Sequence, residues 1–457
     1  CENVNLLHFM SVLQLDALLL AAAVPVARSV SQSTQSPLWK QKWFPAASMA
    51  VVVFVFSEWS MGQGVREAGV LFSLVDQRDA LTAFAMRAFS SFFVMSDVTT
   101  MASGPAVLWI CLSRLPRRPF ALAAGLAVLL LAEGVLACLF LASGTQMWWT
   151  ALSLSRLLAG ISVPLRWCVL LSFLQEVALQ IASSLPQQRS HNEQLWFRLV
   201  GAMTFFGALL CRLVAAIPLP PWGLEGVLGP LLVLLCSWWM SRVSAPAVED
   251  LCHETLELDD RASMTTTSPS KGLLALVVSS LVMASCWLPL LRLLVPLLLQ
   301  EAPPPQHNPN ILVESWIQWN QWLACGACCY TLAVRFLGCR PALSTFRLVS
   351  MGGITLIFWR MTSSMPDRTL LVALLCSLVG LGIPILLASV PQSPLSLVPV
   401  VLLSTSFSLF IHTNMIGADT VASLCRIFLG CTLLDLTCWL PLCVTSWWRQ
   451  QPRHTRR

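Results

Sequence analysis

The chain has 457 residues, of which 56% are hydrophobic and only 11% are charged. Globular proteins carry roughly 25% charged residues, and a soluble chain of this length could not hide so much hydrocarbon and keep its surface wetted. The net charge of +6 does not indicate a nucleic-acid partner, because the basic residues lie in short connectors and not beside aromatic residues on a polar face. The composition therefore predicts an all-α integral membrane protein.

The first apolar stretch runs from Leu6 to Ala27 and contains one charged residue, Asp16. Residues 5–27 fit a cleaved signal peptide, an additional transmembrane span or a helix lying at the membrane interface. Because the sequence begins at Cys1 and not at Met, the position of the natural N-terminus stays open. We treat residues 1–43 as an N-terminal segment with room for one extra hydrophobic helix.

Twelve further stretches meet the requirement of about 20 mostly apolar residues for a transmembrane helix. The first six are 44–63, 84–112, 120–141, 148–172, 195–217 and 222–241, and the last six are 272–299, 314–337, 343–360, 369–390, 395–416 and 421–446. A polar linker, 244–271, separates the two sets and has the acidic, Ser/Thr-rich composition of a flexible connector. The sequence thus predicts two six-helix halves, 44–243 and 272–447, followed by a basic tail, 448–457.

The basic residues predict the orientation of these helices. With the segment before residue 44 placed in the cytoplasm, most of the 28 Lys and Arg residues fall in cytoplasmic loops. The outside loops then hold only Arg66, Arg78, Arg360 and Arg368. This bias follows the positive-inside rule and predicts that both ends of the twelve-helix core are cytoplasmic. It also argues against a cleaved signal peptide, which would leave the following residues outside.

Two basic turns occupy matching places in the two halves. The first contains Arg114, Arg117 and Arg118 before Pro119, and the second contains Arg335 and Arg340 before Pro341. Proline is tolerated in the first turn of a helix, so each Arg-Pro pair fits the start of the next span. The repeat indicates that the two halves arose by duplication.

On these residues the chain resembles the major facilitator superfamily. Arg114, Arg117 and Arg118 match the three basic positions of its loop signature, whereas Ser113 replaces the expected Asp and Pro116 the loop Gly. In the fourth predicted span, Arg156 and Gly160 match the Arg-x-x-Gln-Gly signature, with Ala159 in place of Gln. The resemblance implies two six-helix bundles that rock around a solute bound between them. It also implies a cytoplasmic gating role for Arg114, Arg117, Arg118, Arg335 and Arg340.

Ionisable side chains inside a bilayer are costly and usually face a water-filled path or pair with each other. The candidates for solute or coupling-ion contacts are Glu58, Asp97, Glu133 and Arg156. We hypothesise that Asp97 or Glu58 binds and releases a proton, with Arg156 as its partner or as a contact for an anionic solute. Structural ion pairs are the competing interpretation of the same residues.

The cysteines give no indication of a metal site or a cofactor. Cys325, Cys328 and Cys329 have zinc-like spacing, but no second ligand pair follows them, and helix packing explains them better. We expect neither a metal nor a cofactor.

These patterns predict a secondary active transporter for a small organic solute, with proton coupling or symport as one option. We expect a monomer surrounded by membrane lipid, with no nucleic-acid partner and no enzymatic activity. The alternative is a membrane-embedded lipid or glycosyl transferase. Its usual clusters of His, Asp or Glu at a membrane face are not seen in the sequence.

Overall fold

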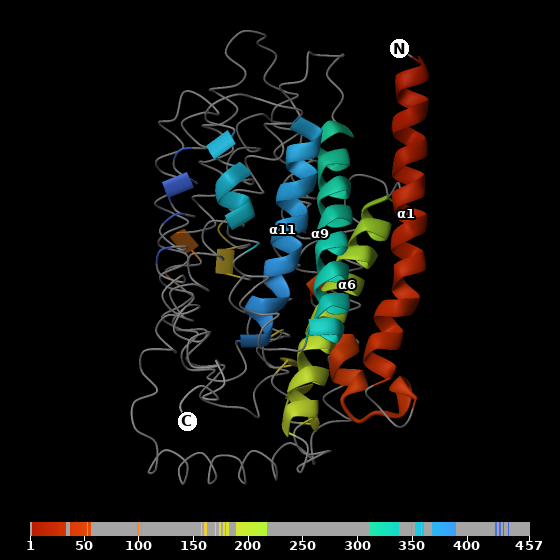
Figure 1. The fold of residues 1–457 in the computed structure, drawn as a ribbon, viewed down its shortest axis with the longest axis vertical. Coiled ribbons are helices and arrows are strands. Elements are labelled where there is room, and N and C mark those ends of the chain that lie inside the picture. Colours follow the sequence, from red (N-terminus) through yellow and green to blue (C-terminus); the bar gives the residue numbers. More distant parts are fainter. Residues whose placement is uncertain are drawn as a thin grey trace, which may run out of the picture.

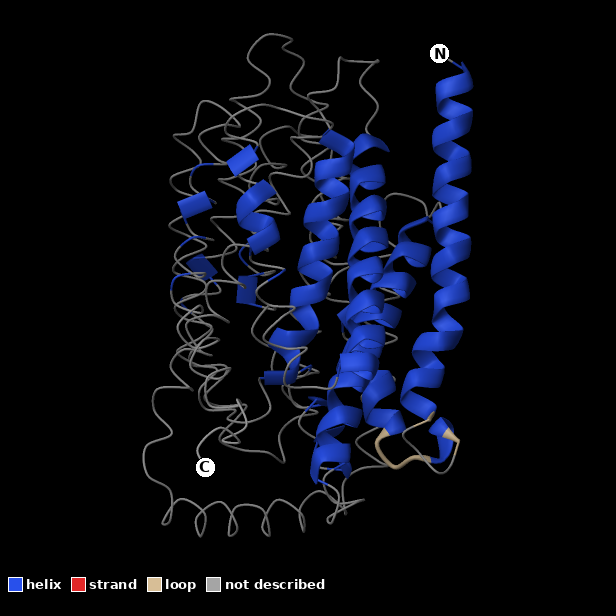
Figure 2. Cartoon of the chain, in the orientation of Figure 1, coloured by secondary structure: helices blue, strands red, loops and turns tan. Residues whose placement is uncertain are grey.

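The computed structural model describes about a third of the chain, and all the regular structure in that part is helical (Figures 1 and 2). The described residues are 2–32, 37–52, 54–55, 98–99, 102, 157, 160–161, 170, 173–174, 177–178, 180–181, 189–216, 310–337, 349, 352–357, 359–360, 368–389, 426, 429–430, 433 and 437. The predicted linker at 244–271 and the tail at 448–457 lie outside them, and so do most of the predicted spans.

The N-terminal segment forms one long helix, α1 (Glu2–Ser31). At 1.5 Å per residue its 30 residues extend about 45 Å, more than the hydrocarbon core of a bilayer. A short 3-10 helix, η1 (Leu38–Lys40), follows, and the chain becomes helical again from residue 44, where the first of the twelve spans was predicted to begin.

Three long helices lie side by side with α1 in Figure 1. They are α6 (Arg189–Ala216), α9 (Asn310–Leu337) and α11 (Arg368–Ser389). They correspond to the predicted fifth, eighth and tenth spans, and they differ from those predictions mainly by starting up to six residues earlier. α6 begins in a polar stretch, residues 189–194, that hydropathy alone assigns to a loop.

The core of the described part lies where α6 and α9 pack against each other. α9 also packs along α11, and α1 contacts both α6 and α9. Large side chains buried there include Phe205 of α6 and Tyr330 of α9. The colours in Figure 1 show that α6 and α9 run in opposite directions, as expected for an odd-numbered and an even-numbered span.

Glycines allow these helices to approach closely. A Cβ atom added to Gly326 of α9 would meet the carbonyl oxygen of Ser377, and one added to Gly380 of α11 would meet that of Leu323. The backbones of α9 and α11 therefore touch, as small residues permit in membrane helix pairs. Gly201 of α6 packs instead against the side chains of Tyr330 and Thr331.

The outer faces of the helices are apolar. Leu18 of α1 is 65% exposed and Phe336 of α9 is 78% exposed, with further exposed leucines along α6 and α11. Among the described residues, Gln14–Ser31 of α1 and Gln194–Leu213 of α6 are long and apolar enough to cross a membrane. Exposed hydrocarbon of this kind is stable only when lipid covers it.

Candidate functional site

Several polar side chains of α6 and α9 are buried. They include Thr204 of α6, which is 1% exposed, and Asn320, Gln321 and Thr331 of α9, which are at most 2% exposed. The Thr204 hydroxyl donates to the carbonyl oxygen of Val200 at 2.9 Å, and the Thr331 hydroxyl donates to that of Ala327 at 2.8 Å. Both hydroxyls therefore have their hydrogen-bond partners within their own helices.

Gln321 stands apart from these residues. Its side-chain nitrogen, Nε2, is buried and has no hydrogen-bond partner among the described residues. A buried amide donor without a partner costs roughly 1–3 kcal/mol, so such groups usually serve a ligand or a water molecule. Gln321 is therefore a candidate for contact with a polar ligand.

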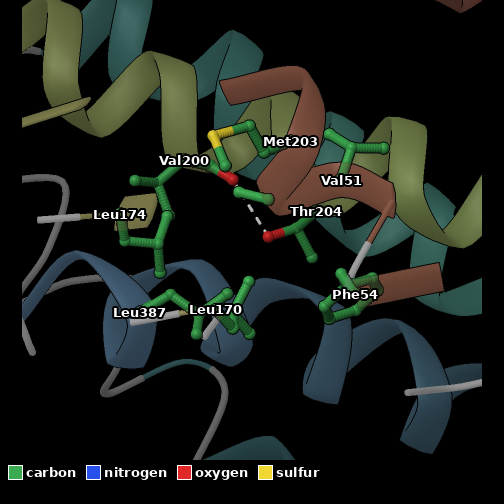
Figure 3. Close-up of a pocket in the computed structure, with 9 residues that line it drawn as sticks. Val51, Phe54, Leu170, Leu174, Val200, Met203, Thr204 and Leu387 are labelled. Atoms are coloured by element: carbon green, nitrogen blue, oxygen red, sulfur yellow. Dashed lines mark hydrogen bonds between the residues drawn. The ribbon is translucent and has the colours of Figure 1, made fainter. Parts of the chain in front are cut away.

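A small apolar cavity lies between α6 and the C-terminal part of α11 (Figure 3). Figure 3 shows Val51, Phe54, Leu170 and Leu387 around it, and among its described lining residues Thr204 alone is polar. Leu387 belongs to α11 of the predicted second half, and the other lining residues belong to the predicted first half. The cavity has room for about a single water molecule, so the conformation described here does not hold an organic solute at this place.

An ion pair joins α1 to α6 within the predicted fifth span. Arg212 donates from Nε to Oδ1 of Asp16 at 3.0 Å and from Nη2 to Oδ2 at 2.6 Å. The Arg212 side chain is 6% exposed and that of Asp16 is 30% exposed. Two parallel hydrogen bonds to one carboxylate fix the geometry of the pair as well as its charge balance.

A second arginine of α6 also binds α1. Arg198 donates from Nη1 to the carbonyl oxygen of Ser29 at 3.4 Å and from Nη2 to the side-chain oxygen of Gln194. The contact places a positive charge at the C-terminal end of α1, where the helix dipole favours it.

Eight of the nine predicted site residues lie outside the described residues. They are Glu58, Asp97, Glu133, Arg156, Arg114, Arg117, Arg118 and Arg340, and their assigned roles stay predictions. The ninth, Arg335, lies in the last turn of α9, with its guanidinium carbon 5.8 Å from the centre of the Phe336 ring.

The Arg212–Asp16 pair was not predicted. Asp16 was noted as the one charge in the first apolar stretch, and Arg212 was counted only as a basic residue within a span. Two opposite charges in separate apolar helices were the available signal, because each would be costly in lipid without the other.

The three clustered cysteines of α9 differ in their surroundings. Cys328 is buried, Cys325 is half-buried and Cys329 is exposed, and all three are free thiols. Within the described ranges, no group of three or more His, Cys, Asp or Glu side chains could hold a metal ion.

Solved structures of membrane transporters match the arrangement of this chain. The xylose transporter XylE from E. coli, in a partially occluded inward-open conformation, superposes with a TM-score of 0.59 and 12% identity, covering 90% of this chain and 98% of that one. The chain has the major facilitator fold. The predicted resemblance is thereby confirmed at the level of the fold, and the fold is that of an all-α, multi-pass membrane protein.

Other transporters of this fold match about as well. The human organic anion transporter MFSD10 gives a TM-score of 0.53 at 16% identity, over 89% of this chain and all of that one. The POT family transporter PepTSo gives 0.52 at 12% identity, over 90% of this chain and 99% of that one. No family model and no curated protein matches the sequence itself, so the similarity lies in the fold and not in the overall sequence.

Proposed function

We propose that this protein is a secondary active transporter that moves a small organic solute across a membrane by alternating access. The observation that carries the proposal is the fold, which the chain shares over nearly its whole length with transporters of several different solutes. The packing of α6 against α9 supports it, because these helices belong to the two predicted halves.

The character of the α6–α9 contact suits two halves that move against each other. Gly201 packs against side chains that can rotate, and the Thr204 and Thr331 hydroxyls are bonded within their own helices. Separating such surfaces breaks few strong polar bonds. The small cavity lies between residues of the predicted first half and Leu387 of the predicted second half. It would widen as the two halves part.

Apart from Arg212, whose charge Asp16 balances, the buried polar residues described on α6 and α9 are uncharged, which favours a neutral or singly charged solute over a highly charged one. For coupling we retain Asp97 or Glu58 as the proton-binding group and Arg156 as its partner.

The test is solute uptake into proteoliposomes with an imposed pH gradient. A panel of neutral and singly charged organic solutes should contain at least one that accumulates above the level in protein-free vesicles. Proton coupling predicts that a gradient, acidic outside the vesicle, raises this uptake and that either Asp97→Asn or Glu58→Gln abolishes the stimulation. Retention of pH-driven uptake by Asp97→Asn and by Glu58→Gln would remove both residues from the coupling mechanism.

The alternative function is a membrane-embedded lipid or glycosyl transferase. The same vesicles can be analysed by mass spectrometry for a chemically changed solute or lipid. Accumulation of an unchanged solute supports transport, whereas turnover without accumulation supports the enzyme. Light scattering of the purified protein in detergent tests the expected monomer.

A further inference from the structure

We propose that α1 is a retained transmembrane helix that is fixed to α6 and lies across the contact between the two halves, so that it moves with the first half and slides over α9. The inference rests on the proposed transport function, because it assigns α1 a place in the relative motion of the halves.

The first observation is the attachment of α1 to α6 at two separate points. Asp16 binds Arg212, and the carbonyl oxygen of Ser29 binds Arg198. Along α6 the two arginines are about 21 Å apart, and along α1 the two acceptors are about 20 Å apart, from the rise of an α-helix. Because the earlier residue of α1 binds the later arginine of α6, the two helices run antiparallel, and the equal spacing keeps them in register over more than half the hydrocarbon core of a bilayer.

The second observation is that this attachment depends on α1 remaining in the molecule. Arg212 is 6% exposed, and its charge in the apolar span is balanced by Asp16. Removing α1 would leave a buried guanidinium without its carboxylate, which is strongly unfavourable in protein and in lipid. Removal of residues 5–27 as a signal peptide would therefore destabilise α6.

The third observation is the direction of the apolar faces of α1. Leu19, Val26 and Val30 are buried and recur on one face of the helix, whereas Leu18, Leu20 and Val24 are exposed on the others. A helix with one packed stripe and apolar residues elsewhere suits a position between protein and lipid. A helix lying flat at the membrane interface would instead present polar residues on its open side.

The fourth observation is that α1 reaches past α6 to α9. It contacts both helices, and it lies beside them over most of its length in Figure 1. Because α6 and α9 belong to different predicted halves, α1 covers one side of the contact between them. When the halves rock, a helix bonded to α6 by an ion pair keeps that contact and changes its position relative to α9.

Distances between spin labels in the full-length protein test this directly. In a background with all 17 native cysteines replaced, labels are attached in pairs at Leu18→Cys of α1, Leu213→Cys of α6 and Phe336→Cys of α9, which are all exposed positions. We expect a single narrow distance distribution for positions 18 and 213. We expect broad or two-peaked distributions for 18 with 336 and for 213 with 336.

The role of the ion pair is tested on the same labels. Asp16→Asn keeps the size of the side chain and removes its charge, and it should broaden the distribution between positions 18 and 213. Gln14→Ala, at an exposed polar position two residues before Asp16 on α1, is the matched control and should leave that distribution narrow. Exchanging the charges, with Asp16→Arg and Arg212→Asp together, should restore the narrow distribution.

The outcomes separate this inference from the proposed function. A narrow distribution for 213 with 336 under all conditions means that the halves do not move, and it overturns the transport proposal together with the inference. The distance between positions 213 and 336 can instead be broadly distributed while that between 18 and 336 is narrow. This result means that α1 moves with the second half, and it overturns the inference alone. An intact mass of the purified protein that lacks α1 overturns it as well.

Discussion

The α9–α11 contact and the α6–α9 contact are both close, yet different atoms make them. At Gly326 and Gly380 the backbones of α9 and α11 touch, and nothing at that point can rotate out of the way. At Gly201 the neighbours are the side chains of Tyr330 and Thr331, which can adopt other rotamers. The α9–α11 contact lies within one predicted half, and backbone against backbone suits a rigid junction. The α6–α9 contact lies between the predicted halves, and side chains at the contact suit a movable junction.

The largest expected effect on stability is at the rigid contact between α9 and α11. Gly380→Ala places a methyl group against the carbonyl group of Leu323, with the carbonyl carbon and Cα of that residue at 3.0 Å. Overpacking against backbone should destabilise the protein by about 3 kcal/mol or more. Thermal unfolding followed by tryptophan fluorescence measures the loss. Gly352→Ala is the matched control, because a Cβ there meets nothing within 4 Å, and it should unfold at or above the wild-type temperature.

A smaller loss of stability is expected at the Asp16–Arg212 ion pair, and the loss differs between the two partners. Asp16→Ala leaves the nearly buried Arg212 unbalanced, at a cost of about 3 kcal/mol, whereas Arg212→Ala leaves the more exposed Asp16 and should cost less. Removing both side chains should recover part of the loss. Equal melting temperatures for the two single variants, with additive losses in the double variant, would mean that the pair carries no coupling.

At the movable contact between α6 and α9 the expected loss of stability is smaller again. Gly201→Ala meets the Tyr330 ring, with Cδ1 at 2.8 Å, and also the Thr331 hydroxyl. Because side chains can shift, we expect a loss of about 1–2 kcal/mol with the fold retained. Thr331→Ala in the same chain should restore most of the melting temperature. A loss as large as that of Gly380→Ala would remove the distinction between the two contacts.

The smallest effect on stability is expected at Gln321. Gln321→Leu replaces a buried amide whose Nε2 lacks a partner in the described part of the chain, so the free energy of unfolding should change by less than about 1 kcal/mol or increase. If Gln321 contacts a solute, the variant should lose uptake while keeping its melting temperature. Unchanged uptake by a stable variant would show that the amide has no role in transport.

Among the described helices, hydropathy predicted α9 and α11 to within four residues at each end. The predicted span 314–337 corresponds to α9 (Asn310–Leu337), and 369–390 corresponds to α11 (Arg368–Ser389). The predicted start of α6 was late because its first residues, Arg189, Ser190 and His191, are polar. Those residues lie in the helix, but they carry no hydrophobic signal.

The site was less accessible to sequence reasoning. The search for charged residues within spans selected Glu58, Asp97, Glu133 and Arg156, which lie outside the described residues, and it did not pair Asp16 with Arg212. The two residues of that pair are 196 positions apart, and no local pattern shows which helices are neighbours. Likewise, only the structure shows that Gly201 packs against Tyr330 and Gly207 against Phe54.

The sequence by itself determined the class of this protein, because only a bilayer accommodates so much hydrocarbon and only helices or closed barrels satisfy their backbone there. The basic turns and the order of apolar stretches also predicted the family whose fold the chain has. The tertiary structure decided which helices meet and with which atoms. It placed α1 beside α6 and α9, matched Asp16 with Arg212 and put glycines at the crossings, because such contacts depend on the spatial order of helices far apart in the chain.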